Sequence, residues 1–268
     1  MRYRSLLLAS VASSAIGLAT AASGADMPVY LKAPPPVWSW TGFYLGGNVG
    51  YGWGKSDTTV SFFDPSGNLL SSSNGAIGMD GVIGGGQIGY NWQNRNWVWG
   101  LETDLQASGQ KGSGTFVCGL ACGIVPGVSE TINQKLDWFG TVRGRLGYTV
   151  TPTVLLYGTG GLAYGDIKTD GTISDPAAFS VSTVKTGWTA GVGVEARIVG
   201  NWTAKIEYLF MDLGHASGSV TDQPTGNICS INHTASVTSC QPSNALTSNF
   251  SSAFTDNIVR VGVNYKFN

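Results

Sequence analysis

The chain ends with Asn257-Ile-Val-Arg-Val-Gly-Val-Asn-Tyr-Lys-Phe-Asn268, in which apolar and polar residues alternate. Successive side chains of a β-strand point to opposite faces, so this stretch has one apolar face and one polar face. The apolar face carries Val259, Val261, Val263, Tyr265 and Phe267, and the polar face carries Arg260, Gly262, Asn264, Lys266 and Asn268. A strand of this kind is typical of a transmembrane β-barrel with a lipid-facing exterior and a polar lumen.

Seven segments upstream alternate in the same way. In six of them one side is rich in aromatic and aliphatic residues, and the other side carries glycine, amides or charges. The segment 154–164 is less regular, because Leu155, Leu156 and Tyr157 are contiguous. The seven segments cover residues 43–53, 82–92, 97–107, 136–150, 154–164, 188–198 and 202–210. Each is about as long as the 9–11 tilted residues that cross a bilayer as a strand. The sequence therefore predicts an all-β fold, an eight-stranded antiparallel transmembrane β-barrel.

The connections between these segments are of two kinds. Very short connections at residues 93–96, 151–153 and 199–201 alternate with long polar stretches near 54–81, 108–135, 166–187 and 212–255. This alternation predicts short periplasmic turns and long extracellular loops, with both termini in the periplasm. A soluble lipocalin-like barrel is the structural alternative, but it would place its apolar side chains inside.

The first part of the chain has the features of an export signal. Arg2 and Arg4 precede an apolar, Ala-rich stretch, and Ser23-Gly24-Ala25 fits a signal-peptidase site. The following residues contain four prolines, which favour an extended segment. We therefore predict a signal peptide over 1–25, a Pro-rich periplasmic lead-in over 26–40 and a barrel over 41–268.

Composition narrows the functional classes. Charged residues make up 12% of the chain, about half the usual share of roughly 25%. The formal net charge of −1 gives no electrostatic basis for binding nucleic acid. The glycine-rich run at 158–163 resembles a dinucleotide fingerprint but lacks a following helix, and no hydrolase or zinc-protease motif occurs. The sequence thus predicts a protein that is not an enzyme, has no cofactor and has membrane lipid as its partner.

The inward positions carry most of the charge, and an eight-stranded barrel is barely wide enough for side chains to fill. The predicted lumen network consists of Glu102, Asp104, Asp137, Glu195 and Glu207 facing Arg143, Arg145, Arg197, Lys205, Arg260 and Lys266. A charge that is shielded from water costs several kcal/mol unless it is paired. We therefore expect salt bridges across the lumen. They either plug and stiffen the barrel or line a narrow ion path that opens when the pairs rearrange.

Two sets of loop residues could carry chemistry. The cysteines form two local pairs, Cys118 with Cys122 and Cys229 with Cys240. Export favours a disulfide within each pair, whereas a zinc site would need ligands from different loops to converge. The two histidines, His215 and His233, are either solvated or contact haem or a metal ion at the cell surface.

Three stretches resemble a known family: Trp40-Thr-Gly-Phe-Tyr-Leu-Gly-Gly-Asn-Val-Gly-Tyr-Gly-Trp53, Lys32-Ala-Pro-Pro-Pro36 and the terminal strand. They are similar to the porin-like outer-membrane β-barrel proteins of alphaproteobacteria, which are distant relatives of the OmpA transmembrane domain. The resemblance implies an eight-stranded barrel with roles in envelope integrity, as a surface antigen or in host contact. Porin-like or haem-binding activity is described for some members, and no catalytic residues carry over.

The resemblance also implies a partner for the terminal strand. Proteins of this kind usually end on an aromatic residue that the barrel-assembly machinery reads. Here Tyr265 and Phe267 are the expected assembly signal, and Asn268 makes Phe267 the penultimate residue.

Together these features predict a non-enzymatic integral protein of the Gram-negative outer membrane, a structural and surface-exposed component of the envelope. Two alternatives stay open. One is a porin for small solutes. The other is a surface receptor or adhesin whose extracellular loops bind haem or a host molecule.

Overall fold

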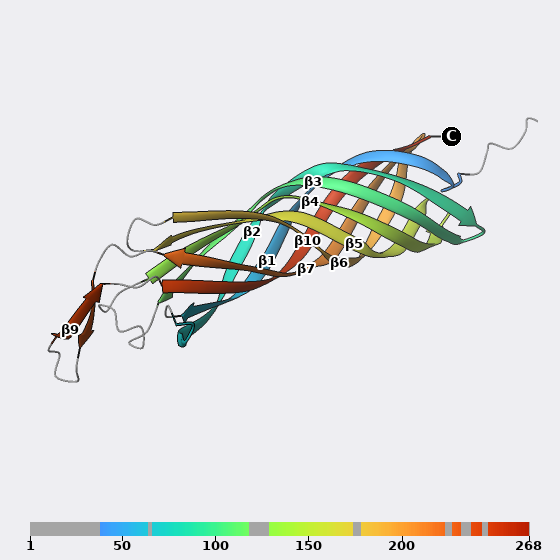
Figure 1. The fold of residues 1–268 in the computed structure, drawn as a ribbon. Coiled ribbons are helices and arrows are strands. Elements are labelled where there is room, and N and C mark those ends of the chain that lie inside the picture. Colours follow the sequence, from blue (N-terminus) through green and yellow to red (C-terminus); the bar gives the residue numbers. More distant parts are fainter. Residues whose placement is uncertain are drawn as a thin grey trace, which may run out of the picture. The chain divides into compact units, whose positions relative to one another are not determined.

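The computed structural model describes residues 38–63, 66–117, 129–173, 178–222, 227–231, 237–242 and 246–267. The predicted signal peptide and most of the lead-in lie outside these residues. Eight strands form a closed antiparallel barrel in the order β1-β10-β7-β6-β5-β4-β3-β2 (Figure 1). Their bounds are β1 Gly42–Phe63, β2 Leu69–Asn94, β3 Trp97–Val117, β4 Ser129–Thr151, β5 Val154–Ile173, β6 Ala178–Val199, β7 Trp202–Asp222 and β10 Leu246–Lys266.

The predicted architecture is confirmed: an eight-stranded antiparallel barrel that closes between the first and last barrel strands. β10 pairs with β1 from Lys266 opposite Tyr44 to Thr247 opposite Phe63. Two short strands, β8 (Asn227–Ile231) and β9 (Val237–Pro242), form a separate two-stranded sheet. No helix among the described residues is long and apolar enough to cross a membrane.

The three short connections lie at one end of the barrel, which we call the turn end. They occupy residues 95–96, 152–153 and 200–201, within the predicted turns. Arg95 and Gly200 each have a φ of 54°, in the left-handed region that a tight reversal requires. The opposite end of the barrel is called the extended end. The halves of the barrel next to these two ends are called the turn half and the extended half.

The strands extend much further than the sequence pattern predicted. The barrel strands contain 20 to 26 residues, about twice the 9–11 that cross hydrocarbon. Much of the polar stretches predicted as long loops is therefore hydrogen-bonded strand. The β1–β2 ladder, for example, continues through Ser61 opposite Ser72.

The exterior of the turn half is an apolar band. Exposed aromatic and aliphatic side chains alternate with inward residues on every barrel strand. The band covers residues 43–53, 82–92, 97–105, 142–150, 156–162, 188–198, 202–208 and 259–267. We treat these ranges as the membrane-spanning segments, because such a surface is stable in hydrocarbon and poorly suited to water.

The extended half has the opposite arrangement. Its interior is a hydrophobic core, and its exterior carries exposed polar residues such as Lys55, Asn74, Lys111 and Asn133. The core consists of Val60, Phe62, Ile77, Met79, Ile83, Phe116, Ile132, Leu136, Phe139, Ala163, Ile167, Leu209, Met211, Leu213, Phe250, Phe254 and Ile258. The lipocalin-like arrangement therefore occurs in this half only, so the barrel extends out of the band as a water-exposed tube with an apolar filling.

A β-bulge in β4 accounts for one error in the predicted strand pattern. The β4–β5 register shifts between Leu136 and Trp138. One extra residue reverses which side chains point inward. Leu136, predicted to face lipid, is fully buried in the hydrophobic core, whereas the side chain of Asp137, predicted to face the lumen, pairs with exposed lysines outside.

Candidate functional site: the charge network in the lumen

Eight ionised side chains from five strands meet inside the turn half of the barrel. Spacing of two residues along a strand places successive members on the same inward face. The members are Glu102 and Asp104 on β3, Arg143 and Arg145 on β4, Glu195 on β6, Lys205 and Glu207 on β7, and Arg260 on β10. We call this set the lumen network.

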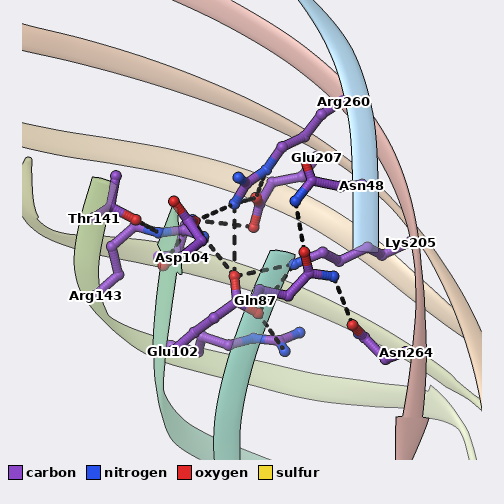
Figure 2. Close-up of polar contacts among 12 residues, drawn as sticks. Asn48, Gln87, Glu102, Asp104, Thr141, Arg143, Lys205, Glu207, Arg260 and Asn264 are labelled. Carbon is purple, nitrogen blue, oxygen red and sulfur yellow. Dashed lines mark hydrogen bonds and ion pairs between the residues drawn. The ribbon is translucent and has the colours of Figure 1, made fainter. Parts of the chain in front are cut away.

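Arg143 joins three carboxylates at the centre of the network (Figure 2). Its Nη2 lies 2.5 Å from Glu102 Oε1 and 2.9 Å from Asp104 Oδ2, and its Nη1 lies 3.2 Å from Glu207 Oε1. Its Nε donates to Thr141 Oγ1 at 2.9 Å. The planar guanidinium thus uses all of its nitrogens, a geometry that lysine could not reproduce.

Arg260 reaches the same acids from the last strand. Its Nη2 lies 2.9 Å from Asp104 Oδ2 and 2.6 Å from Glu207 Oε2, and its Nε donates to Glu207 Oε2 at 2.7 Å. Asp104 and Glu207 are therefore shared between two arginines that come from strands on different sides of the lumen (Figure 2). Such shared pairs cross-link strands that are not neighbours in the barrel.

Lys205 and Arg145 complete the neutralisation. Lys205 Nζ lies 3.0 Å from both carboxylate oxygens of Glu102, and Arg145 Nη2 lies 2.7 Å from Glu195 Oε2. The Arg145 guanidinium lies 3.9 Å from the ring centroid of Tyr157, which adds a cation–π contact. The network thus contains four carboxylates and four cations. In its ion pairs, no side chain exposes more than 4% of its surface.

Neutral side chains fill the space around the ions, and the sequence analysis did not single them out. Gln87 Nε2 donates to Asn264 Oδ1 at 2.7 Å (Figure 2), and Asn264 Nδ2 donates to Glu195 Oε1 at 2.8 Å. Tyr44 and Tyr157 donate to Glu102 and Glu207 at 2.8 and 2.9 Å. Their inward strand positions were visible in the sequence, but the identity of their partners across the lumen was not.

An aromatic cap lies at the turn end. Trp40 is only 2% exposed and packs with Val98, Leu155 and Tyr157. Its Nε1 donates to the carbonyl of Pro152 at 3.2 Å, and its ring makes an edge contact with Trp38 at 5.8 Å. The sequence analysis assigned Trp40 to the lead-in; the structure places its side chain among residues of the barrel.

Three of the eleven residues predicted for the network lie elsewhere. Asp137 is outside the barrel, because of the β4 bulge. Arg197 is exposed at the turn end, where its guanidinium lies 4.7 Å from the Trp38 ring. Lys266 also lies over Trp38, at 4.9 Å, and donates to the carbonyl of Thr41 at 3.1 Å. Arg197 and Lys266 therefore contact the aromatic cap instead of the lumen network.

The predicted loop residues are only partly described. Cys229 and Cys240 are direct register partners in the β8–β9 sheet, while Cys118 and Cys122 lie outside the described residues, so the two disulfides stay predictions. His215 is exposed on β7 and His233 is not described. Within the described ranges, no group of three or more potential ligands is positioned to hold a metal ion.

The expected assembly signal lies on the exterior at the turn end. Tyr265 makes edge contacts with Trp202 at 5.1 Å and with Phe267 at 5.2 Å. These rings belong to an aromatic row at the rim of the apolar band, as in the interfacial girdles of membrane barrels.

Asp256 is a buried carboxyl between the lumen network and the hydrophobic core. It lies outside the membrane-spanning segments. Gln110 Nε2 donates to its Oδ2 at 2.8 Å, and its Oδ1 has no partner among the described residues. Burial raises the pKa of Asp256 to about 6, because no cation is near enough to stabilise its charged form.

Comparison with known proteins identifies the family of this chain and several similar proteins. Residues 8–267 match the family model described as outer membrane protein beta-barrel domain. The chain is 44% identical over 221 residues to a 31 kDa outer-membrane immunogenic protein of Brucella melitensis, covering 79% of this chain and 88% of that protein. It is 37% identical over 179 residues to a 22 kDa outer membrane protein of Rhizobium leguminosarum, covering 66% of each. Among solved structures, OprG from Pseudomonas aeruginosa aligns with 12% identity and a TM-score of 0.46, covering 87% of this chain and 100% of that one.

Removal of Arg143 should destabilise the barrel strongly. Arg143→Ala leaves three buried carboxylates short of a partner, and breaking a buried pair costs about 3–5 kcal/mol. Urea unfolding in detergent micelles measures the loss. The matched control is Lys55→Ala, which breaks the exposed Lys55–Asp57 pair of 3.0 Å and should cost less than about 1 kcal/mol. Equal effects of the two variants would contradict the structural role of the network.

The burial of Asp256 predicts a pH dependence of stability. The folded state holds a proton on Asp256 up to about pH 6, whereas the unfolded chain releases it near pH 4. The free energy of unfolding should therefore fall as pH rises from about 4 to 6, by up to about 3 kcal/mol. Asp256→Asn should lack this component and be the more stable protein at pH 7.5. Parallel urea titrations at pH 4.5 and 7.5 test this, and an identical pH profile for both proteins would refute it.

Proposed function

Because this chain belongs to the outer membrane protein beta-barrel domain family, we propose that it is a non-enzymatic and non-conducting structural protein of the bacterial outer membrane. It is an outer-membrane β-barrel, and its relatives are named as outer-membrane immunogenic proteins. The single observation that supports a structural role is the filled lumen. The filling has three layers: the aromatic cap at the turn end, the lumen network, and the hydrophobic core of the extended half.

Each layer opposes transport for a different reason. The cap occupies the turn-end mouth with the buried ring of Trp40 and the partly buried ring of Trp38. The network contains equal numbers of buried opposite charges, so an ion that passes has to displace existing pairs at a cost of several kcal/mol. The hydrophobic core offers few polar partners to a permeating ion or polar solute, and buried ones such as Thr58, Gln134 and Ser252 already bond to one another. The porin alternative requires all three layers to rearrange together.

We also propose the orientation of the barrel. The turn end faces the periplasm and carries both chain ends of the barrel, since the strand number is even. The extended end faces outward, because membrane barrels have short turns on the periplasmic side and longer connections on the outer side. Its polar exterior suits the water there. The water-exposed tube then presents strand surface, and not only loops, to the outside of the cell. The receptor alternative stays a prediction, because most of the loop that carries His233 lies outside the described residues.

A filled lumen should not conduct. Purified full-chain protein reconstituted in planar bilayers should give no steady single-channel current, with insertion verified by flotation of the same protein in vesicles. Reproducible conductance steps that disappear in Arg143→Ala would contradict the proposal and favour the porin alternative.

The proposed orientation can be tested on whole cells. An epitope inserted after Gly67, in the turn between β1 and β2 at the extended end, should bind antibody on intact cells. An epitope inserted after Gly200, in the β6–β7 turn, should bind only after permeabilisation. The reverse pattern would overturn the orientation.

A further inference from the structure

Three lysines form a continuous row on the outside of neighbouring strands. Lys111 on β3 is the direct register partner of Lys135 on β4, and Lys135 is the direct partner of Lys168 on β5. The side chains of Lys135 and Lys168 are 53% and 41% exposed. Like charges directly opposite each other on one face destabilise a sheet. The row therefore needs nearby anions, from the protein or from a ligand, to offset this repulsion.

A second row of polar side chains lies next to the lysines, further from the apolar band. Ser113 on β3 pairs with Asn133 on β4, and Asn133 pairs with Asp170 on β5. A pocket of about 410 Å³ lies between the two rows and is lined by Lys111, Gly112, Ser113, Asn133, Gln134, Lys135 and Asp170. This volume is in the range of pockets that hold small ligands.

The pocket lies at the level of lipid head groups. On the exterior, Trp138 and Tyr164 form an aromatic pair, with 6.1 Å between ring centroids, at the extended edge of the apolar band. Lys135 lies three residues beyond Trp138, roughly 10 Å along the strand at about 3.3 Å per residue. Aromatic girdles mark the edge of the hydrocarbon, and the head-group layer lies just beyond them.

Four carboxylates, Asp80, Asp137, Asp166 and Asp170, lie near the three lysines, but among the described residues only Asp137 makes an ion pair with any of them. Asp137, which the β4 bulge directs outward, accepts from Lys168 Nζ at 2.5 Å and from Lys135 Nζ at 3.3 Å, and its hydrogen bond with Lys168 lowers the pKa of Asp137. Asp166 accepts from Ser182 at 2.6 Å, and Asp80, the register partner of Lys111, accepts from Tyr51. Lys111 makes no ion pair with another described residue. Lys111 and Lys135 therefore keep donors free on the side of the pocket.

The set of groups around the pocket suits a phosphorylated sugar. Ammonium groups make charge-assisted hydrogen bonds to phosphate oxygens. The carboxylate of Asp170, the amide of Asn133 and the hydroxyl of Ser113 can bond to sugar hydroxyls on the far side of the phosphate. The Asp170 carboxylate would weaken the binding of free phosphate, because it repels an anion.

We propose that this pocket binds the phosphorylated sugar head group of an outer-leaflet glycolipid, with Lys111 and Lys135 on the phosphate and Ser113, Asn133 and Asp170 on the sugar. The acyl chains of the same lipid then lie against the apolar band below Trp138 and Tyr164. The assignment to the outer leaflet rests on the orientation proposed above, whereas the chemistry of the pocket does not.

The test uses purified full-chain protein in detergent, with bound lipid measured by native mass spectrometry. The probes are diphosphorylated lipid A, the same lipid with its phosphates removed, and inorganic phosphate. The double variant Lys111→Gln/Lys135→Gln removes both charges and keeps hydrogen-bonding groups. It should bind lipid A about tenfold more weakly or worse, as expected for the loss of charge-assisted bonds. The matched control Lys55→Gln, at an exposed lysine of β1, should bind as the wild type does.

Each outcome bears on the proposal. Loss of binding in the double variant or on removal of the lipid phosphates supports it, provided that the variant unfolds at the same urea concentration as the wild type. Wild-type affinity in the double variant overturns it, as does equal binding of dephosphorylated lipid A. Displacement of lipid A by inorganic phosphate at equal concentration would reassign the pocket to free phosphate.

The two proposals can fail separately. If the Gly67 epitope is hidden on intact cells while lipid A binding persists, the orientation fails and the pocket remains. If the epitope is exposed and lipid A does not bind, the pocket fails and the structural role remains.

Discussion

The structure depends on closure of the hydrogen-bonded ladder between β1 and β10. In hydrocarbon, an unpaired backbone amide costs several kcal/mol, so a sheet can cross a membrane only when it has no free edge. Closure with eight strands leaves a narrow interior, and alternation then forces every second side chain into it. Side chains have to fill this interior, and the polar and charged groups among them have to bond to one another. The lumen network, with four carboxylates and four cations on five strands, meets this requirement in the turn half.

The environment outside the barrel changes along the strands, and the side chains follow it. Where lipid surrounds the barrel, apolar residues point out and ions point in. Beyond the aromatic rim, where water surrounds it, the arrangement reverses and a hydrophobic core such as that around Phe139 and Ile77 fills the tube. Asp256 lies where the two fillings meet, which is why its carboxyl is buried without a cation. The reversal allows strands of 20 to 26 residues to continue through both environments.

The sequence was sufficient for the barrel and for most of the network. Alternation, interrupted only at Leu155-Leu156-Tyr157 in β5, identified all eight barrel strands and eight of the eleven proposed lumen charges. It failed at the β4 bulge, because one inserted residue changes the inward face without leaving a signal in the composition, and Asp137 was placed in the lumen as a result. It failed in the extended half for another reason. Serine, threonine and glycine are common in loops, so polar strands with apolar partners inside were interpreted as loops.

The sequence by itself determined the fold class, the strand number and the membrane-facing rows, because alternation with a period of two is a local property of each strand. Only the tertiary structure decided which charges pair, since Arg260 and Asp104 are 156 positions apart and meet only after closure. It also decided that Trp40 enters the barrel and that Lys111, Lys135 and Lys168 stand in one row. Such contacts depend on register and bulges, which the packing of the whole barrel fixes.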